Sequence, residues 1–415
     1  MKVSPHMSVA KPVSDAPSFR FIALVAMLTA LMAMSIDTML PAQGVMAQEL
    51  GASSAADEPL IILLFFAGNM IGIPVFGPMS DSLGRKPSIF AGLVFFIIGA
   101  LLCYAAWSFP VLLLGRFIQG FGAASPRIVS VAMVRDGSQG AAMARTMSFV
   151  MSVFMLVPIF APSIGQFVLI FANWHYLFLG LAVMALIVGL WLGLGQPETL
   201  SDHNRRAFSA AQLLNASVEV LSNRIALGYT LATGMVFGIF TTYLSVCRRI
   251  YVDQYGMGNW FPVIFGSLAI CIAAAMIVNG SLVQKLGMRR LSRIAMVGYA
   301  SVWIVVFALS LLYSGSPPLV IMMPLFGLWF FTAGFTFGNF NAMAMEPMGH
   351  IAGMAAAVSG VLSQAMGIVL GIIAARAYDG TMTSLSAYFI VYALVAYGIT
   401  EWAESARRTP KKSLA

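Results

Sequence analysis

Three charged side chains lie inside the long apolar runs of this sequence, where a charge could do chemistry. Asp37 is the only carboxylate placed well inside such a run, and Arg116 and Arg127 are the two guanidinium groups. Charges within a bilayer are costly and are usually kept for a function. The proton affinity of a carboxylate depends on its hydration and on nearby positive charge, so Asp37 could bind a proton or a cation in turn. A hydrogen bond from Asp37 to a helix end is the structural alternative.

The spacing places Arg116 near Asp37 and on one face with Arg127. Asp37 lies four residues before Pro41 and Arg116 lies six residues after Pro110, so both are expected at a similar depth and could form an ion pair. Arg127 follows Arg116 by eleven residues, which is three helical turns with about 20° of rotation. Arg127 could guide the proton or bind an anionic group. Equally, both arginines could pack between helices or extend toward the membrane surface.

The sequence lacks the residue patterns that metal binding, phosphate binding and nucleophilic catalysis require. The four histidines are not paired at the spacing of a metal site, and the three cysteines lie inside apolar runs rather than in a CxxC pair or a disulfide framework. The sequence contains no HExxH motif, no GxxxxGK(S/T) phosphate-binding loop and no nucleophile paired with a base inside a span. We therefore expect no enzyme, no metal and no cofactor, with the proton as coupling ion.

Composition places these residues in a membrane. Hydrophobic residues make up 60% of the 415-residue chain and charged residues 9%, with a mean hydropathy of +0.89, whereas soluble proteins carry about 25% charged residues. The net charge of +8 is carried mainly in short loops, which argues against a nucleic-acid-binding face. A helix needs roughly 20 apolar residues to cross a bilayer. The chain predicts an all-α membrane protein with twelve such spans, at residues 20–41, 58–80, 87–108, 110–134, 146–171, 174–195, 223–247, 259–283, 291–313, 318–342, 350–376 and 383–402.

The distribution of Lys and Arg predicts the orientation of these spans. With the N-terminus inside, eighteen of the 23 basic residues lie in inward-facing segments, including Lys2, Lys11, Arg206, Lys411 and Lys412. Outward-facing segments carry Arg248, Arg249 and Arg376. Both termini are therefore predicted to be cytoplasmic, in a multi-pass protein of the cell inner membrane. A cleaved signal peptide is not expected, because the first apolar run is long and lacks a small-residue cleavage site.

Two loops have similar sequences at equivalent places, which indicates that the chain consists of two related halves. Residues 77–86 read GPMSDSLGRK after the second span, and residues 280–290 read GSLVQKLGMRR after the eighth. In both loops a glycine is followed by a polar residue four positions on, a second glycine and then basic residues. Parallel repeats of six helices occur in transporters that bind substrate between the halves. We expect an N-terminal half over residues 1–195, a cytoplasmic linker over 196–222 and a C-terminal half over 223–415.

Four motifs resemble those of the major facilitator superfamily, and in particular those of the twelve-span drug–proton antiporters of the bicyclomycin-resistance (Bcr/CflA) type. Residues 77–86 resemble the loop motif GxxxDRxGRK, and residues 114–124 (LGRFIQGFGAA) resemble the fourth-span motif. Residues 161–166 (APSIGQ) resemble the antiporter motif GPxxGG, and residues 35–42 (SIDTMLPA) resemble the STDMYLPA run. The resemblance implies a major facilitator fold. In the loop motif Ser82 replaces the first arginine, and in the antiporter motif Ala161 and Gln166 replace two glycines.

The resemblance also implies a gate in the first loop and a bend in the fifth span. Ionised Asp81 is expected to accept hydrogen bonds at the start of span eleven, near residues 349–352, and breaking this contact would favour the inward-open state. A tight turn that only fixes orientation is the simpler alternative. The expected gating residues are Gly77, Asp81, Gly84, Arg85 and Lys86 in the loop, with Pro158, Pro162 and Gly165 bending the fifth span and sealing a leak path.

Residues on spans that line the cavity in relatives are expected to contact the substrate. Besides Arg127 they are aromatic or amide side chains: Asn69, Phe240, Tyr243, Trp329, Phe330, Phe337, Asn339 and Asn341. Ordinary packing within the bundle is the alternative for each of them. Arg248 and Arg249 could attract an anionic or zwitterionic substrate or extend to lipid headgroups.

Together, the resemblance and Asp37 predict a secondary active transporter that exports drugs or amphipathic small molecules in exchange for protons, by alternating access. The C-terminal half has no acidic residue well inside a span, which favours export over uptake of a hydrophilic solute. Proton-coupled uptake of a metabolite is the main alternative, and a membrane receptor is a remote one. The expected partners are a small-molecule substrate and the lipid bilayer, with no nucleic acid, and the chain is expected to act as a monomer.

Overall fold

The computed structural model describes residues 18–138, 140–205 and 210–408, and every regular element within these ranges is a helix. Apolar runs of this length form helices because lipid offers no partner for backbone N–H and C=O groups. Five of the basic residues used to predict the orientation lie outside the described residues, namely Lys2, Lys11, Arg206, Lys411 and Lys412.

The N-terminal half, here called the N-half, contains six long helices with short helical turns between the first two. Its elements are α1 (Phe19–Asp37), η1 (Leu40–Ala42), α2 (Gln43–Glu49), η2 (Ala55–Asp57), α3 (Leu60–Leu83), α4 (Arg85–Tyr104), α5 (Phe109–Gly137), α6 (Gly140–Phe171) and α7 (His175–Gly195).

The C-terminal half, the C-half, repeats this arrangement. After η3 (Asp202–Asn204) and the short helix α8 (Ala210–Ser222), its elements are α9 (Arg224–Arg248), the π-helical η4 (Arg249–Gln254), η5 (Gly258–Trp260), α10 (Phe261–Leu286), α11 (Met288–Leu312), α12 (Leu319–Met345), η6 (Glu346–Ile351), α13 (Ala352–Arg376) and α14 (Met382–Arg408).

The predicted membrane spans are confirmed. Within the described ranges, eleven helical segments are long and apolar enough to cross a membrane, and the longest of them, Leu319–Arg376, contains α12, η6 and α13. Twelve spanning helices result, with α2 and α8 as shorter additions. Their bounds differ from the predicted ones by a few residues, because several helices extend beyond the apolar run into the polar loops.

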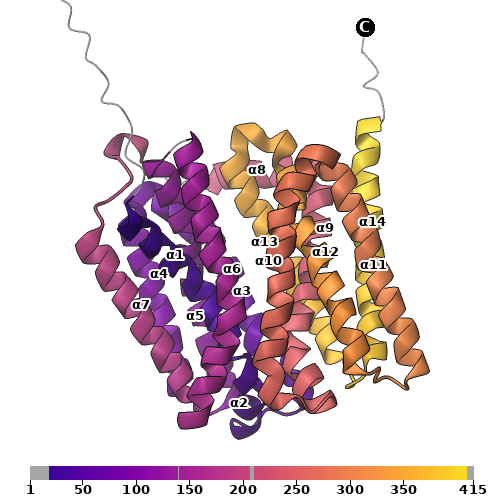
Figure 1. Cartoon of the computed structure of the whole chain (residues 1–415). Helices are drawn as coiled ribbons and strands as arrows, with labels where there is room; N and C mark the ends of the chain where they lie inside the picture. The colour runs from indigo at the N-terminus through magenta and orange to yellow at the C-terminus, as the bar shows by residue number, and fades with distance from the viewer. Residues whose placement is uncertain (1–17, 139, 206–209, 409–415) are drawn as a thin grey trace, which may run out of the picture.

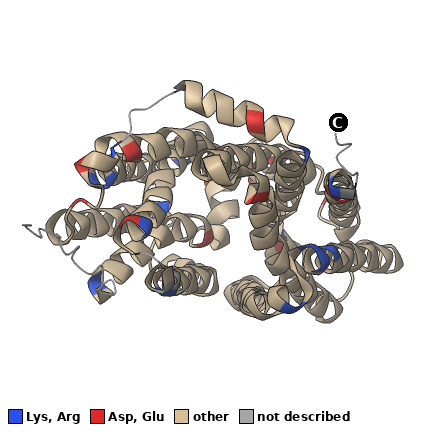
Figure 2. Ribbon diagram, turned by 90° about the horizontal axis from the view of Figure 1, so that it is seen from above, with Lys and Arg blue, Asp and Glu red and all other residues tan. Residues whose placement is uncertain are grey.

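Figure 1 shows the helices of the two halves side by side, with α2 at the lower end and the end of α14 at the upper end. We call the upper end, where α1 begins and α14 ends, the terminal face, and the opposite end the distal face. Seen from the terminal face in Figure 2, most helices are viewed nearly end-on as two groups, with Lys and Arg present on both.

The predicted repeat is visible at corresponding turns of the two halves. Gly84 separates α3 from α4 with a φ of 115°, and Gly287 separates α10 from α11 with a φ of 75°. Residues other than glycine rarely adopt such positive φ values, which explains why both loops carry a glycine at this position. Two consecutive spans are therefore joined by the same tight turn in each half.

Close packing of α3 on α5 fixes the interior of the N-half. A Cβ added at Gly120 would overlap the carbonyl oxygen of Phe65, and one added at Gly68 would overlap that of Phe117. Small residues at these positions let the two backbones touch, as is common between membrane helices. This contact determines where the side chains of α5, including Arg116, can lie.

The linker between the halves contains a helix that packs on the C-half. Ala216 and Val220 of α8 are buried against Ala226 of α9 and Ala355 of α13. His350 of η6 adds a contact, with Nε2 lying 2.7 Å from an oxygen of Glu219. The second part of the segment predicted as a linker, α8, is thus anchored to the C-half at the terminal face.

Candidate functional site

Asp37 ends α1 in the interior of the N-half. It is 5% exposed, and no described side chain donates a hydrogen bond to its carboxylate or forms an ion pair with it. Gly165 of α6 lies against the following residue, since a Cβ added at Gly165 would overlap the carbonyl oxygen of Thr38. The thiol of Cys247, at the end of α9, lies close enough to Asp37 to interact with it electrostatically. Asp37 is therefore a buried acid without a described partner, where α1 and α6 meet near the C-half.

Arg116 is fully buried on α5 and does not pair with Asp37 in this conformation. Its Nε donates a hydrogen bond to the carbonyl oxygen of Ile61 at 3.1 Å, and its Nη1 donates to Oε1 of Gln119 at 2.5 Å. The guanidinium lies over the ring of Phe65, 4.4 Å from the centroid. The expected ion pair is therefore not formed, because the close packing of α5 on α3 directs this guanidinium to the backbone of α3. Its Nη2 has no partner among the described residues.

The expected bend residues of the fifth span lie where α6 meets two other helices. Pro158 and Pro162 are both inside α6, where each leaves a backbone carbonyl without its usual donor. Ala161, between them, is fully buried against α1. On the other side, a Cβ added at Gly266 of α10 would lie 2.9 Å from the carbonyl oxygen of Ile159. The helix therefore contacts both halves through small residues, and its role as a seal stays a prediction.

Arg85 holds the terminal end of the N-half together. Its side chain is 3% exposed, and Nε donates to Asp136 Oδ2 at 2.7 Å. Its Nη1 donates to Asp81 Oδ1 at 2.5 Å and to Ser80 Oγ at 2.9 Å. One guanidinium thus links α3, α4 and α5, which is a structural role that the loop motif alone did not predict.

Asp81 does not contact the start of the eleventh span here, contrary to expectation. Its described partner is Arg85, and the Asp81 side chain is 47% exposed. Gly77, one turn earlier, is half-buried, and its carbonyl oxygen accepts a hydrogen bond from Ser80. The predicted contact with residues 349–352 is absent from the described residues because the two halves are not joined at this face. An open gate is the state in which such a contact would be broken.

Glu198 caps the turn that contains Gly84. Its carboxylate accepts hydrogen bonds from the backbone N–H groups of Arg85 and Lys86 at 3.0 Å each, and from those of Thr199 and Leu200. Burial by itself would raise the pKa of Glu198, but the four backbone donors outweigh it and hold the pKa below its ordinary value. The Nζ of Lys86 donates to the carbonyl oxygens of Gly193 and Gln196, so this lysine is also a structural part of the turn.

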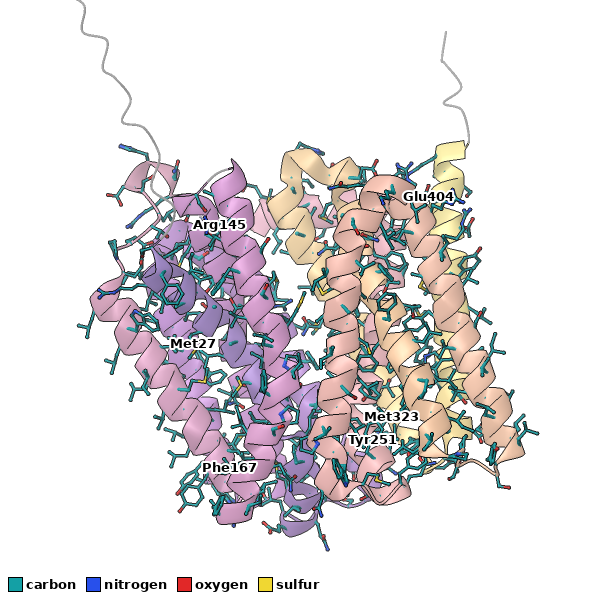
Figure 3. The ribbon with its side chains drawn as sticks, viewed as in Figure 1. Met27, Arg145, Phe167, Tyr251, Met323 and Glu404 are labelled. Atoms are coloured by element: carbon teal, nitrogen blue, oxygen red, sulfur yellow. The ribbon has the colours of Figure 1, made fainter. Side chains whose placement is uncertain are left out.

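Five of the expected substrate contacts are buried among protein partners in this conformation. Tyr243, Trp329 and Phe330 pack on one another with ring centroids 4.6–5.2 Å apart. The Tyr243 hydroxyl lies 3.2 Å from that of Tyr251, which Figure 3 places near the distal face.

The two buried asparagines have polar partners. Asn339 exchanges two hydrogen bonds with Asn279 of α10. Asn69 is buried at the contact between halves described below. These side chains are part of the packed interior.

Four of the expected contacts remain accessible. Phe240 of α9 and Phe337 of α12 are half-buried and face each other edge to face, with centroids 6.0 Å apart. Arg127 is exposed, and no described residue pairs with it. Asn341 is exposed near the terminal end of α12. Arg127 lies ten residues before Gly137, the end of α5, or about 15 Å along the helix. A guanidinium at this position is costly against lipid, so it is expected to face water or to extend toward the membrane surface.

The two halves contact each other from the distal face to the middle of the bundle. Gln364 of α13 donates to the carbonyl oxygen of Phe66 at 3.0 Å and to Oδ1 of Asn69 at 3.3 Å, both on α3. The ring of Phe66 packs edge to face on Phe237 of α9 at 5.3 Å. Among the described residues, no hydrogen bond or ion pair joins the halves near the terminal face. Figure 1 shows the same asymmetry, with the halves adjacent at the lower end and apart at the upper end.

Among the described residues, two ion pairs cross between the halves at the distal face, and sequence reasoning missed both. Arg248 Nη1 lies 3.6 Å from Glu58 Oε1, and Arg376 Nη2 lies 3.7 Å from Asp57 Oδ1. The signal was available in the charge pattern. The charge bias makes arginines rare in segments predicted to face outward. An arginine in such a segment therefore suggests a carboxylate partner on the same face. Arg249 instead lies over the ring of Tyr378, 4.8 Å from the centroid, within the C-half.

The terminal face of the C-half carries its own ion network. Glu346 in η6 accepts hydrogen bonds from Arg289 and Arg407, and Glu404 accepts one from Tyr229 at 2.7 Å. Figure 3 places Glu404 at this face. Like the network around Arg85 in the N-half, it lies at the turn that carries the repeated loop motif, which includes Arg289.

The described residues contain no group of three or more His, Cys, Asp or Glu side chains arranged to hold a metal ion. The free thiols of Cys103 and Cys247 are buried.

Twelve spanning helices in two similar halves, which meet around buried polar residues at one face and are apart at the other, define a membrane transporter of the two-domain type. The family model described as the Major Facilitator Superfamily matches residues 22–375, and the chain belongs to this superfamily.

Similar proteins include three bacterial relatives that match most of the chain. An uncharacterized MFS-type transporter, YdgK of Bacillus subtilis (strain 168), is 28% identical over 350 residues, which cover 84% of this chain and 86% of the relative. The bicyclomycin resistance protein homolog of Haemophilus influenzae is 27% identical over 392 residues, covering 92% of this chain and 96% of the relative. The multidrug resistance protein MdtL of Salmonella heidelberg (strain SL476) is 26% identical over 311 residues, covering 74% and 76%.

Solved structures show the same fold. The crystal structure of a D-xylose–proton symporter matches with a TM-score of 0.73 and 13% identity, covering 93% of this chain and 98% of that one. The crystal structure of the human organic anion transporter MFSD10 matches with a TM-score of 0.66 and 17% identity, covering 93% and 100%. At this level of identity the likeness concerns the fold alone.

Proposed function

We propose that this transporter exports drugs or other amphipathic small molecules across the cell inner membrane in exchange for protons, with Asp37 as the proton site. The observation that carries the proposal is the buried carboxylate of Asp37 without a described partner, next to the α1–α6 contact at Gly165. An ionised carboxylate in such a place is costly unless it is paired or solvated. We infer that Asp37 carries a proton in this conformation and releases it when its hydration changes.

The proposed direction of transport follows from the orientation expected from the charge bias. With the terminal face in the cytoplasm, the contacts of Gln364 and Phe66 would close the outer side, and the exposed Arg127 would be reached from the cytoplasmic side. Substrate would enter from the cytoplasm as the proton leaves Asp37. Rocking of the halves would then expose the site to the outside, where substrate leaves and a proton binds.

The proposed substrate class rests on the accessible side chains. Phe240 and Phe337 offer an aromatic wall, and Arg127 and Asn341 offer polar groups, which together suit an amphipathic molecule. The names of the relatives, a bicyclomycin resistance protein homolog and multidrug resistance proteins, support export of such compounds. Proton-coupled uptake of a metabolite is the competing function. We further propose that the chain works as a monomer in the bilayer, with no cofactor besides the coupling proton.

Inverted membrane vesicles test the proposal. A pH gradient with an acidic lumen is imposed, lipophilic cations and neutral antibiotics are offered as a panel, and both substrate uptake and lumenal pH are followed. Wild type is compared with Asp37→Asn and with the matched variant Asp202→Asn, which makes the same change at a side chain that is 86% exposed. We expect wild type and Asp202→Asn to release lumenal protons as substrate enters, and Asp37→Asn to lose this exchange.

Two outcomes would contradict the proposal in different ways. Full coupling in Asp37→Asn would show that the proton binds elsewhere, while export itself would stand. Wild-type vesicles in which no compound of the panel moves protons would remove the support for drug export and favour metabolite uptake.

A further inference from the structure

The pair formed by Glu58 and Arg248 differs from other ion pairs of the distal face in its burial. The side chains of Glu58 and Arg248 are 4% and 14% exposed, whereas those of Asp57 and Arg376, which form the neighbouring pair between the halves, are 23% and 57% exposed. Oε1 of Glu58 has no hydrogen bond among the described residues, so the guanidinium 3.6 Å away is its main compensation. Removing either charge from a buried pair leaves the other uncompensated.

Arg248 has a second partner within its own half. Its Nη1 donates to both carboxylate oxygens of Asp253, at 3.0 and 3.2 Å, and the Asp253 side chain is 52% exposed. Because Arg248 keeps this partner, it can leave Glu58 without becoming an unpaired charge. Glu58 has no comparable second partner. When Glu58 is ionised, separating the halves therefore costs more free energy at Glu58 than at Arg248. A neutral Glu58 would not pay this electrostatic cost.

The guanidinium also lies directly on the N-half backbone. A Cβ added at Gly44 of α2 would overlap the Nη2 and Cζ atoms of Arg248. Gly44 therefore leaves room for the arginine of the C-half, and this contact exists only while α2 and the end of α9 are adjacent. Geometry and charge both restrict this contact to one conformation.

We propose that Glu58 is a second proton site, and that proton binding to it releases Arg248 and allows the distal face to open. The ionised pair holds the halves together at this face, and the neutral carboxyl removes the attraction across the contact. The charged and titratable groups that face Glu58 are the following: Cys247, Arg248, Arg249 and Asp253 from α9 and η4, and the adjacent Asp57, which pairs with Arg376 of α13.

The arrangement links the distal face to the interior. Cys247 precedes Arg248 at the end of α9, and its thiol is within electrostatic range of both Asp37 and Glu58. Movement of this helix end away from the N-half would therefore change the surroundings of both carboxyl groups at once. The proposal rests on the proposed function only for its direction, which places the distal face outside the cell.

Spin-label distances measure the state of the distal face directly. Labels replace Trp107, after α4, and Leu312, at the end of α11, which are 75% and 78% exposed. The protein is reconstituted in lipid nanodiscs with its three native cysteines changed to serine. Distances are recorded at about pH 8 and about pH 5, because carboxyl groups in proteins take up protons across this range when burial disfavours their charge.

We expect the long-distance, open population of wild type to grow at least about threefold at the lower pH. Glu58→Gln, which imitates the protonated acid, should be open to the same extent at both pH values. Asp57→Asn, which neutralises the neighbouring exposed pair, should behave like wild type. Gly44→Ala should also favour the open state at both pH values, because it displaces the guanidinium without altering any charge. The double variant Glu58→Gln/Arg248→Gln should be no more open than Glu58→Gln.

A Glu58→Gln protein that keeps the wild-type distances and pH response would overturn the proposal, as would an equal response in Asp57→Asn. Asp37→Asn in the same labelled background separates this proposal from the proposed function. If its distances still respond to pH while drug–proton exchange is absent from wild-type vesicles, Glu58 controls the distal face and the transport reaction is a different one. If the pH response is lost in Asp37→Asn alone and kept in Glu58→Gln, the switch is Asp37 and the inference about Glu58 is wrong.

Discussion

Arg85 and Asp81 form one ion pair, yet the structure predicts that they contribute differently to stability and to transport. The Arg85 side chain is 3% exposed and connects three helices, through Asp136, Asp81 and Ser80. Removing one partner of a buried ion pair costs about 3–5 kcal/mol. Here water reaches the orphaned carboxylates, because the Asp136 and Asp81 side chains are 17% and 47% exposed. We therefore expect Arg85→Ala to lower the free energy of unfolding by about 2–3 kcal/mol, below the full buried-pair cost.

Asp81→Asn should leave stability nearly unchanged. The amide oxygen can still accept from Arg85, and pairs that are half-exposed contribute about 0–1 kcal/mol. Its effect should fall on transport instead, because the family resemblance assigns Asp81 a contact with α13 only when the terminal face is closed. A change of about 1.4 kcal/mol in the balance between the two conformations alters their ratio about tenfold.

Denaturant unfolding in detergent micelles and drug transport in inverted vesicles separate these effects. Arg293→Ala is the matched control, because Arg293 and Glu401 form a pair at the same face with side chains 47% and 33% exposed. We expect Arg293→Ala to cost under about 1 kcal/mol. Equal destabilisation by Asp81→Asn and Arg85→Ala would refute the division of roles. An Arg85→Ala protein as stable as Arg293→Ala would also refute it, because burial would then not determine how much free energy of unfolding is lost with the ion pair.

Three further predictions concern pH, the contact between halves and the aromatic residues. Because hydrogen bonds lower the pKa of Glu198 on folding, its carboxylate stabilises the protein above the ordinary Glu value of 4.5 and loses this contribution as the pH falls below it. The stability difference between wild type and Glu198→Gln, followed by unfolding across pH, should therefore shrink in acid. Gln364→Ala should open the distal face by about 1 kcal/mol, measured by spin-label distances, whereas Ser363→Ala should not, because Ser363 bonds within the C-half. Tyr243→Ala should cost about 3–5 kcal/mol of stability, whereas Phe337→Ala, at a half-buried ring, should mainly change which drugs are exported in the vesicle assay.

Each of these has a clear contrary result. A Glu198→Gln difference that stays constant into acid would mean that the four backbone donors do not favour the charged form. Equal opening by Ser363→Ala would show that the measured change reflects loosening of α13 rather than loss of the bond to α3. Loss of stability in Phe337→Ala as large as in Tyr243→Ala would place Phe337 in the packed core, and the proposed aromatic wall would have to be abandoned.

Much of the fold follows from local features of the sequence. Span positions depend on the length and hydropathy of single runs, and the repeated turns depend on glycines such as Gly84 and Gly287, which adopt positive φ in both halves. The burial of Asp37 could also be predicted, because its place in an apolar run already determines its depth. Partners were harder to predict. Arg116 shares that depth but pairs with the backbone of α3, since the close approach of α3 and α5 at Gly68 and Gly120 directs its side chain.

By itself, the sequence determined the number of spans, the two halves, the superfamily resemblance and the acid most worth testing, because each depends on residue types and short spacings. Tertiary structure alone decided which charges meet and at which face the halves close. The bond from Gln364 to Asn69 joins residues 295 positions apart, and the pair of Glu58 and Arg248 likewise crosses from one half to the other. Such contacts depend on how separate helices pack in three dimensions, and the hydropathy of single segments does not contain this information.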